Sequence, residues 1–191
     1  MKNKLIYITG GARSGKSAMA VKIAEKSGGR TAFLATAEPL DSEMRERIRI
    51  HRRGRPAAWV TLELSDYRNV AGIISELADK KCGVVIIDCL TLWISNLLGR
   101  RAGKSGELTG REYALAVKEV VCEISANINA FREFPGTVII VSNETGMGIV
   151  PANQLARIFR DICGKANQYA AEISDEAFLM VSGIPVVLKS R

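Results

Sequence analysis

Apolar residues follow two patterns along this chain of 191 residues. Short unbroken apolar runs rich in β-branched residues are typical of strands buried on both faces of a sheet. Such runs predict strands over residues 4–10, 31–36, 58–64, 82–89 and 137–143. Longer stretches with apolar residues three and four positions apart are typical of amphipathic helices. Such stretches predict helices over residues 16–26, 65–80, 90–98, 111–134 and 151–173.

Two further segments complete the pattern. Residues 38–53 read EPLDSEMRERIRIHRR and predict an arginine-rich helix that is capped by Asp41 or Ser42. Residues 177–189 predict two strands around Gly183, paired as a hairpin. Because strands alternate with helices, we expect an α/β fold with a mainly parallel sheet, flanking helices and antiparallel strands at the C-terminus.

Domain boundaries are not marked anywhere in the sequence. The Gly-rich polar stretch 99–110 is too short to separate domains, and we expect it to be a mobile loop. Since no internal repeat or longer linker divides the chain, we expect a single catalytic domain over residues 1–191.

The composition is typical of a globular enzyme, with 47% hydrophobic and 25% charged residues. The apolar stretch Leu5–Ile8 is too short for a signal peptide, and no run approaches the ~20 apolar residues of a membrane span. The four cysteines form no CxxC pair, and one histidine alone does not complete a zinc site. We therefore expect buried, reduced thiols, no membrane span and a cytoplasmic location.

The segment GGARSGKS, residues 10–17, matches the phosphate-loop pattern G-x-x-x-x-G-K-[ST]. It lies between a predicted strand and a predicted helix, which is the context that the pattern requires. Backbone N–H groups of such a loop and the start of its helix bind phosphate oxygens. Lys16 is then expected to reach the β- and γ-phosphates and Ser17 to ligate Mg²⁺. The alternative is a glycine-rich turn that matches by chance.

A second metal-binding carboxylate is expected at the end of a neighbouring apolar strand, and the segment VVIID supplies Asp88 there. Asp88 also has a structural interpretation, because aspartate commonly caps the helix that follows a strand. The two roles are compatible. The chain is therefore predicted to be a P-loop protein that binds a nucleoside triphosphate with Mg²⁺.

Positive charge is concentrated in one segment. The formal net charge is +7, and residues 45–55 hold six arginines and one glutamate, so this segment alone contributes +5. A compact anion such as a nucleoside triphosphate explains a local excess better than a long polyanion. No aromatic residues interleave with these arginines, as single-strand binding requires, and we expect no nucleic-acid partner.

The only histidine of the chain, His51, stands inside this arginine segment. Neutral imidazole is a good nucleophile, and neighbouring cations disfavour its protonation. On a helix, His51 shares a face with Met44, Ile48 and Arg55, which turns it toward the body of the protein. A histidine on an apolar helix face is also commonly structural, so the pattern alone leaves both roles open.

Several motifs together resemble the bifunctional adenosylcobinamide kinase / adenosylcobinamide-phosphate guanylyltransferase family of cobalamin biosynthesis. They are GGARSGKS after the first strand, MRERIRIHRRGRPAAW at 44–59, NETGMGIVP at 143–151 and the terminal VSGIPVVLK. The resemblance extends over nearly the whole chain. It implies a RecA-like P-loop NTPase fold and assembly as a homotrimer.

The resemblance implies two reactions. ATP or GTP phosphorylates the aminopropanol hydroxyl of adenosylcobinamide, and His51 attacks the α-phosphorus of GTP to form a GMP–histidine intermediate. Adenosylcobinamide phosphate then accepts GMP, which yields adenosyl-GDP-cobinamide. The residues implied in nucleotide binding are Gly10, Gly11, Ala12, Arg13, Ser14, Gly15, Lys16, Ser17, Ala35, Thr36, Ala37, Arg52, Arg53, Gly54, Arg55, Glu63 and Asp88.

The segment NETGMGIVP also has an interpretation from its own residues. It follows a predicted central strand, at the edge of the sheet where ligands bind in open α/β folds. Glu144 is a candidate general base toward the cobinamide hydroxyl, alongside Lys16 and His51 as catalytic residues. Its alternative role is to cap a tight turn between strand and helix.

Two other functions fit parts of the sequence. A simple P-loop small-molecule kinase would transfer a γ-phosphoryl group without a covalent intermediate and use His51 only structurally. A RecA-like ATPase would bind nucleic acid through the arginine helix, with a steep salt dependence. The arginine segment spans only about three helical turns, which disfavours the second of these.

Overall fold

The computed structural model describes residues 3–38, 41–53, 55–64, 69–102 and 109–190, and within the helices the side chains of residues 47, 51, 53 and 102 lie outside this description. The strands it contains are β1 Lys4–Gly10, β2 Arg30–Ala35, β3 Val60–Glu63, β4 Cys82–Asp88, β5 Thr137–Val141, β6 Glu176–Val181 and β7 Ile184–Ser190. The helices are α1 Lys16–Ser27, α2 Ser42–Arg53, α3 Val70–Asp79, α4 Leu90–Ala102, α5 Gly110–Arg132 and α6 Gln154–Ile173.

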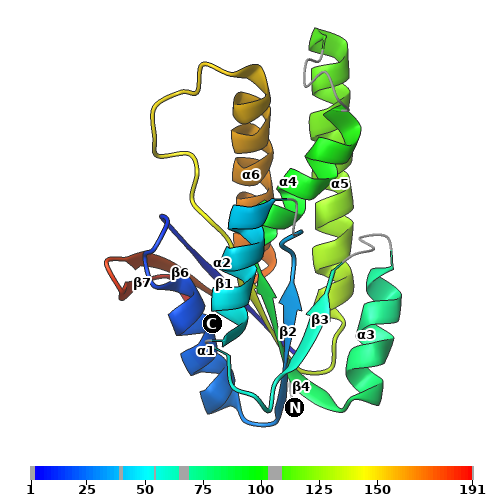
Figure 1. The fold of residues 1–191 in the computed structure, drawn as a ribbon, viewed down its shortest axis with the longest axis vertical. Coiled ribbons are helices and arrows are strands. Elements are labelled where there is room, and N and C mark those ends of the chain that lie inside the picture. The colour runs from blue at the N-terminus through cyan, green and yellow to red at the C-terminus, as the bar shows by residue number, and fades with distance from the viewer. Residues whose placement is uncertain (1–2, 39–40, 54, 65–68, 103–108, 191) are drawn as a thin grey trace.

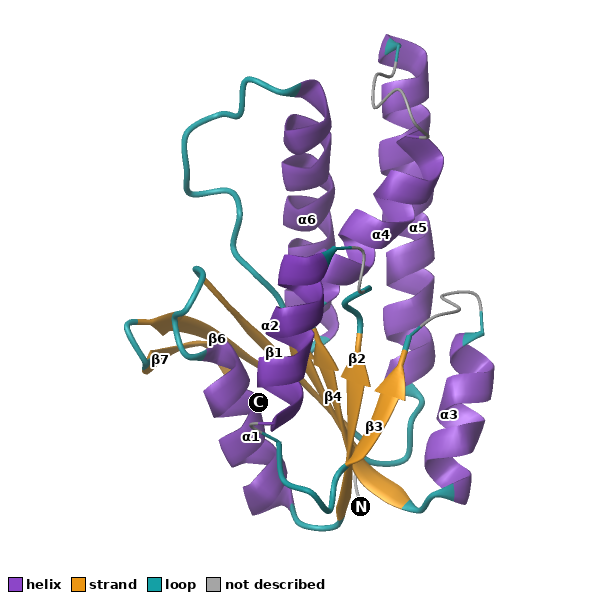
Figure 2. Ribbon diagram, viewed as in Figure 1, coloured by secondary structure: helices purple, strands orange, loops and turns teal. Residues whose placement is uncertain are grey.

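The described strands form one twisted sheet in the order β3-β2-β4-β5-β1-β6-β7 (Figure 2). All neighbouring pairs are parallel except β6 and β7, which form an antiparallel hairpin. The predicted α/β class, the mainly parallel sheet and the antiparallel C-terminal strands are therefore confirmed. Because parallel strands end at the same edge, the segments that follow β1, β2, β4 and β5 meet there.

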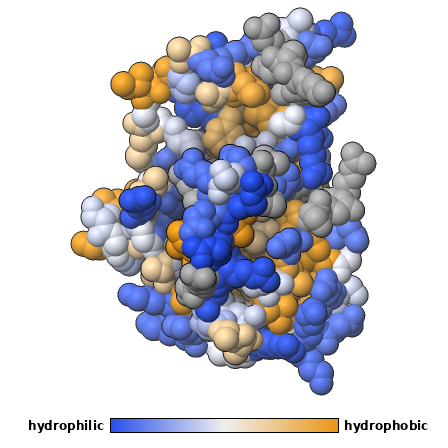
Figure 3. Space-filling view, viewed as in Figure 1, coloured by the Kyte–Doolittle hydropathy of each residue, from blue (hydrophilic) through white to orange (hydrophobic). Residues whose placement is uncertain are grey.

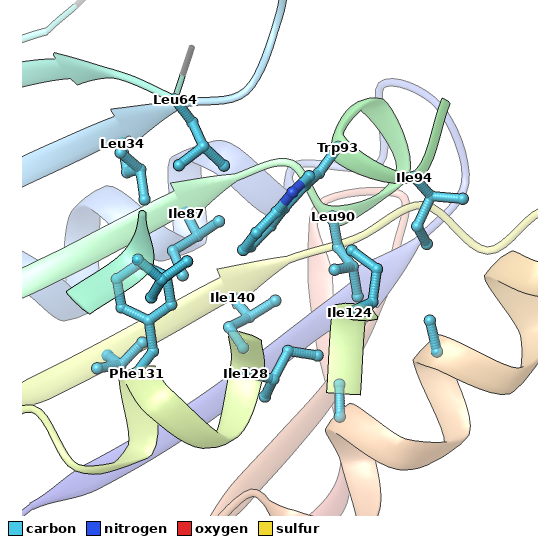
Figure 4. Packing of buried hydrophobic residues seen from close by; sticks show 14 of the residues in the cluster. Leu34, Leu64, Ile87, Leu90, Trp93, Ile94, Ile124, Ile128, Phe131 and Ile140 are labelled. Atoms are coloured by element: carbon cyan, nitrogen blue, oxygen red, sulfur yellow. The ribbon is translucent and has the colours of Figure 1, made fainter. Parts of the chain in front are cut away.

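Helices cover both faces of the sheet (Figure 1). Alternate residues of β4 show the division: Val84 and Ile86 pack with α1, whereas Val85 and Ile87 pack with α3, α4, α5 and α6. This alternation explains why the strand is an unbroken apolar run. Figure 4 shows strand residues gathered against α4 and α5, where Trp93 meets Phe131 edge to face with ring centroids 6.4 Å apart.

Several predicted boundaries were wrong by a few residues. Helix α4 continues to Ala102, so residues 99–102 of the expected loop are helical and residues 103–108 lie outside the described part. Arg101 explains the extension, because it pairs with Glu119 and Glu123 of α5 and holds the last turn of α4. The start of the next helix is fixed by a capping box between Thr109 and Glu112.

Capping also explains the late starts of α3 and α6. Helix α3 begins at Val70, and its N-cap is Asn69, whose side chain accepts a hydrogen bond from the Gly72 N–H. Residues 65–68, where the helix was expected to begin, lie outside the described part. Helix α6 begins after Asn153 in the same way, so Pro151 precedes the helix and is not in its first turn.

The cysteine prediction is correct for three of four residues. Cys82, Cys89 and Cys163 are buried, but Cys122 is exposed on α5. The four cysteines, all within the described residues, form no disulfide. None of the helices in the described ranges has the length and apolar character needed to cross a membrane.

Candidate functional site

The loop between β1 and α1 curls tightly around its own backbone. Arg13 adopts a left-handed conformation with a φ of 57°. A Cβ atom at Gly10 would lie only 2.5 Å from the carbonyl oxygen of Met180, so only glycine fits there. The predicted strand–loop–helix context of GGARSGKS is therefore present, with Lys16 as the first residue of α1.

Lys16 turns back over this loop. Its Nζ donates a hydrogen bond to the carbonyl oxygen of Gly11 at 2.6 Å, and the residue is buried. Burial lowers the pKa of the Lys16 ammonium, while Cys89 and Asp88 act in the opposite direction. The Lys16 ammonium is therefore a partly desolvated cation held against the loop. Its attraction to a bound phosphate group would be stronger there than in open solvent.

Ser17 and Asp88 meet at the same place. The Ser17 hydroxyl donates a hydrogen bond to Oδ2 of Asp88 at 2.9 Å. Asp88 is the last residue of β4, and β5 separates this strand from β1 in the sheet. The two oxygen-bearing side chains predicted to bind a metal are therefore adjacent, although among the described residues no group of three or more His, Cys, Asp or Glu side chains has metal-site geometry.

The loop is supported from two sides. The backbone N–H of Gly183, in the β6–β7 turn, donates to the carbonyl oxygen of Ser14 at 3.0 Å. The backbone N–H of Glu144, after β5, donates to the carbonyl oxygen of Gly10 at 3.0 Å. Both contacts are hydrogen bonds between backbone groups. The position of the phosphate loop therefore depends on the β6–β7 turn and on the segment after β5, which are distant in sequence.

A pocket of about 230 Å³ lies beside Asp88. Its walls come from the ends of β2 and β4, from α2 and from α4, and they include Phe33, Ala35, Ala37, Met44, Ile48, Arg55, Leu92 and Asn143. The guanidinium carbon of Arg55 lies 3.4 Å from the centroid of the Phe33 ring, a cation–π contact. Burial lowers the pKa of Arg55, and Asp88 opposes that effect.

The predicted nucleotide-binding residues of β2 and its following segment divide into two kinds. Ala35 and Ala37 line the pocket. Thr36 is buried, and its hydroxyl exchanges hydrogen bonds with the backbone N–H and C=O of Cys89 at 2.7 and 2.8 Å. Thr36 thus fixes the segment after β4, next to Asp88. Glu63 ends the edge strand β3 opposite Ala35, but it is exposed and does not line the pocket.

The arginine segment is only partly described. Position 51 lies on α2 and follows Ile48 by three residues, but the side chains of His51 and Arg53, and all of Gly54, lie outside the described part of the chain. Arg52 is exposed, whereas Arg55 reaches the pocket. Met44 and Ile48 do face the same pocket as Arg55, as the helical spacing predicted.

Glu144 is not among the residues that line the pocket beside Asp88. Its Oε1 accepts a hydrogen bond from the backbone N–H of Gly146 at 2.8 Å, which is the turn-capping role considered for it. Its catalytic role stays a prediction.

A polar network that the sequence did not reveal holds the end of β5. The Ser142 hydroxyl donates to Oδ1 of Asn167 at 2.6 Å, and Nδ2 of Asn167 donates to the carbonyl oxygen of Asn143 at 3.1 Å. Asn143 in turn donates to Oγ1 of Thr91 at 3.0 Å. The only signal in the sequence was the single polar position Asn167 on the apolar face of α6, which indicates a buried polar contact but not its partner.

A phosphate loop between the first strand and first helix of a parallel sheet, with its serine facing a carboxylate on another strand end, defines a P-loop nucleotide-binding protein. A crystal structure of a KaiC-like protein from Pyrococcus horikoshii has the same fold, with a TM-score of 0.54 and 11% identity over 100% of this chain and 80% of that one. Within this class the chain belongs to the CobU family, cobinamide kinase / cobinamide phosphate guanyltransferase, whose profile matches residues 6–188.

Curated relatives agree with this assignment. The bifunctional adenosylcobalamin biosynthesis protein CobU of Salmonella typhimurium is 40% identical over 97% of this chain and 99% of its own length. The protein of the same name from Escherichia coli K12 is 39% identical over the same shares. The bifunctional protein CobP of Pseudomonas aeruginosa is 40% identical over 96% of both chains. The family predicted from the motifs is therefore confirmed.

Proposed function

We propose that this chain phosphorylates adenosylcobinamide and then transfers GMP from GTP to adenosylcobinamide phosphate. The observation that carries the proposal is the arrangement of Lys16, Ser17 and Asp88 around one phosphate loop, beside a pocket under α2, in a member of this family. Kinase and guanylyl transfer both need a bound nucleoside triphosphate. We propose that one domain serves both steps, with ATP or GTP for the first and GTP for the second.

The phosphoryl-transfer step follows from the loop. Its backbone N–H groups and Lys16 bind the β- and γ-phosphates, and the cobinamide hydroxyl attacks the γ-phosphorus. The bond from the γ-phosphorus to the bridging oxygen breaks, and the nucleoside diphosphate leaves. We propose that Glu144 accepts the hydroxyl proton, which requires its carboxylate to exchange the Gly146 N–H for the substrate.

The guanylyl-transfer step is proposed to use His51. An imidazole nitrogen attacks the α-phosphorus of GTP, the bond to the bridging oxygen breaks, and pyrophosphate leaves. A phosphate oxygen of adenosylcobinamide phosphate then attacks the same phosphorus and releases the imidazole. Support comes from the helix: residue 51 follows Ile48 by three positions, and Met44 and Ile48 both line the pocket beside Asp88.

Nearby cations suit this chemistry. Arg55 is held against Phe33 inside the pocket, where its charge is poorly screened, and Arg52 lies exposed on α2. Bidentate guanidinium groups stabilise negative charge that develops on a phosphate under attack. The apolar walls, Phe33 and Leu92 among them, suit the nucleobase, which leaves the arginines to the phosphates.

Mg²⁺ fits the oxygen atoms at the loop. Hydroxyl and carboxylate oxygens are its preferred ligands, and those of Ser17 and Asp88 lie 2.9 Å apart. When bound, the ion would neutralise charge on the β- and γ-phosphates. Ser17 and Asp88 are the residues that would hold the ion.

Assembly and location are proposed from the family resemblance. We propose a homotrimer, and sedimentation analysis should then give three times the mass of the chain. We also propose a cytoplasmic enzyme, in keeping with nucleotide substrates and four free thiols.

The test of the proposed function is covalent labelling with GTP that carries radiolabel at the α-phosphate, with Mg²⁺ and without corrinoid. Label that survives denaturation, is acid-labile and alkali-stable, and is absent from His51→Ala supports a guanylylated histidine. The His51→Ala variant should still phosphorylate adenosylcobinamide. An unlabelled protein that nonetheless binds GTP would leave a simple P-loop kinase with a structural histidine.

A further inference from the structure

The segment 146–150, which is part of the connection between β5 and α6, exposes large apolar side chains a few residues after Glu144, whose backbone N–H contacts the phosphate loop. Met147, Ile149 and Val150 are 80%, 96% and 62% exposed. Single exposed apolar residues are normal on protein surfaces, but three within four consecutive positions form a patch that needs an explanation. Figure 1 shows the segment, in yellow, as an arch that stands away from the body between β5 and α6.

The arch is anchored at both ends. Near its start, the backbone N–H of Glu144 bonds to Gly10 of the phosphate loop, and the N–H of Gly146 bonds to the Glu144 carboxylate. Near its end, Nη1 of Arg157 donates to the carbonyl oxygens of Pro151 and Ala152 at 2.9 and 2.6 Å. Because both ends are held, the apolar side chains are displayed on a frame that is anchored to Gly10 of the phosphate loop at one end and to Arg157 of α6 at the other.

A polar pocket adjoins the start of the arch. Gly146 forms one wall of a pocket of about 360 Å³ whose other walls come from α5 and α6. Arg160, Lys165 and Gln168 of α6 supply hydrogen-bond donors there. The pocket also contains Asp161, whose carboxylate accepts from the Tyr113 hydroxyl at 2.7 Å and lies 3.9 Å from Nε of Arg160. The apolar arch and the polar pocket share Gly146, two residues after Glu144, whose N–H bonds to Gly10 of the phosphate loop. Figure 3 shows hydrophobic surface in the upper part of this face, among hydrophilic patches.

Corrinoid chemistry matches this combination. A corrin is a large macrocycle with methyl-bearing apolar faces, amide side chains around its rim and, in cobinamide, one side chain that ends in a hydroxyl. A kinase must place that hydroxyl at the γ-phosphate, so the ring has to lie on a surface adjoining the phosphate loop. The arch is such a surface, and amide oxygens of the rim are acceptors for the donors of the pocket.

We propose that Met147, Ile149 and Val150 form a platform for one face of the corrin ring, and that the pocket beside Gly146 receives an amide side chain of its rim. This proposal rests on the proposed function, because it takes a cobinamide as substrate. Apolar contact supplies affinity and the pocket supplies orientation, as in most sites for large cofactors. Continuity with the phosphate loop favours a substrate over a second copy of the chain as the occupant.

The test compares the double variant Met147→Ser/Ile149→Ser with the wild-type protein. Equilibrium dialysis, which the colour of the corrinoid makes direct, measures the Kd for adenosylcobinamide. We expect the Kd to rise at least tenfold, while binding of a non-hydrolysable GTP analogue and labelling by GTP stay unchanged. Gln168→Ala should raise the same Kd by a smaller factor. Leu115→Ser is the matched control, because Leu115 is 54% exposed on α5 outside this pocket.

The other outcomes overturn the proposal. An unchanged Kd in both the double variant and Gln168→Ala would remove the arch and the pocket from substrate binding. Loss of the wild-type oligomer in the double variant, with corrinoid affinity retained, would make the arch a contact between copies of the chain. If wild-type protein binds GTP but no adenosylcobinamide, the proposed function itself fails, which is a different result from failure of the platform.

Discussion

The hydroxyl of Ser17 donates a 2.9 Å hydrogen bond to the carboxylate of Asp88, and so joins the first turn of α1 to the end of β4. The two strands that lead to these residues are not neighbours, because β5 lies between them. The bond therefore holds the Ser17 hydroxyl oxygen and a carboxylate oxygen of Asp88 together across the end of a third strand. Two such oxygen atoms are the groups that would hold the proposed Mg²⁺ ion.

Replacing either partner should weaken the use of Mg²⁺. We expect Ser17→Ala and Asp88→Asn to lower the rate of phosphoryl transfer by about 10–100-fold and to raise the Mg²⁺ concentration needed for half-maximal rate. A Mg²⁺ titration of initial rates measures both effects. Ser27→Ala is the control, since Ser27 ends the same helix and bonds only to Ile23 within it. An unchanged Mg²⁺ dependence in both variants would remove this pair from metal binding.

Lys16 should make nucleotide affinity depend on pH, and this dependence should appear at a lower pH than an ordinary lysine would cause. Burial lowers the pKa of Lys16 in the free protein, and a bound triphosphate raises it again because it favours the charged form. Protons are then taken up on binding between these two pKa values, so affinity falls as pH rises through that interval. An ordinary lysine has a pKa of about 10.4, and we expect the nucleotide affinity to begin falling at a lower pH than this.

Calorimetry measures this uptake directly. Titration with a non-hydrolysable ATP analogue in two buffers of different ionisation enthalpy gives the number of protons bound at each alkaline pH. ATP is preferable to GTP here because its base does not lose a proton in this range. Lys16→Met should bind weakly and with no such uptake. A wild-type protein that binds without proton uptake up to pH 10 would contradict a depressed pKa.

Much of the site was predictable because its residues act through local sequence. The spacing of Gly10, Gly15, Lys16 and Ser17 specifies a loop conformation, and the strand before it and the helix after it are strongly patterned. Asp88 was predictable because it is a charged residue at the end of a long apolar strand, and hydrophobic packing does not explain a carboxylate at that position. The arginine helix was predictable from its concentration of positive charge. The spacing of Met44 and Ile48 correctly predicted which face of this helix lines the pocket.

The remaining features depend on partners that are distant in sequence. The contact of Arg55 with Phe33 and the hydrogen bond of Gly183 to Ser14 join segments whose approach only the sheet order determines. Helix α4 extends past Gly99 because Arg101 finds two glutamates on α5, which no local propensity reveals. The contact of Glu144 with Gly146 is local by contrast, and it matches the turn-capping role that was predicted as the alternative for Glu144.

The β6–β7 turn should influence nucleotide binding through its contact with the phosphate loop. Gly183 has a φ of 85° and donates its N–H to Ser14. Gly183→Ala should lower the free energy of unfolding by about 1–2 kcal/mol, since a left-handed conformation is costly with a Cβ. It should also weaken nucleotide binding by shifting the phosphate loop.

Gly28→Ala separates these two effects. Gly28 has a φ of 70° at the end of α1, and a Cβ there would meet nothing within 4 Å. With a ψ of 167°, Gly28 lies in a region that is open essentially only to glycine, so we expect a loss of stability of about 1–3 kcal/mol in urea denaturation but an unchanged nucleotide Kd. Equal affinities in the two variants would show that the hairpin does not position the loop.

Asn167 should stabilise the fold through its hydrogen bonds to Ser142 and Asn143, and not through the space that its side chain fills. Asn167→Ala leaves the Ser142 hydroxyl and the Asn143 carbonyl without this partner, at a cost of about 1–3 kcal/mol for each buried group. Asn167→Asp has nearly the same shape but sets an oxygen against the Asn143 carbonyl. Denaturant unfolding should therefore show both variants destabilised. If Asn167→Asp matched the wild-type protein, the network would not contribute.

The cysteines should differ sharply in reactivity. Burial raises the pKa of Cys163 to about 12 and also raises the pKa values of Cys82 and Cys89. Because the thiolate is the reactive form, these buried thiols should resist iodoacetamide at pH 8, while exposed Cys122 reacts. Mass spectrometry should show one modified cysteine per native chain and four after denaturation.

Cys122→Ser provides the control for this assignment. The variant should show no fast modification in the native state and three modified cysteines in denaturant, because only the exposed thiol has been removed. Cys163 should stay unmodified in the native protein at every pH well below its pKa of about 12. Rapid modification of Cys89 at pH 8 would be the informative failure. Cys89 follows Asp88 directly and lines the pocket, so its reactivity would mean that the site opens to solvent.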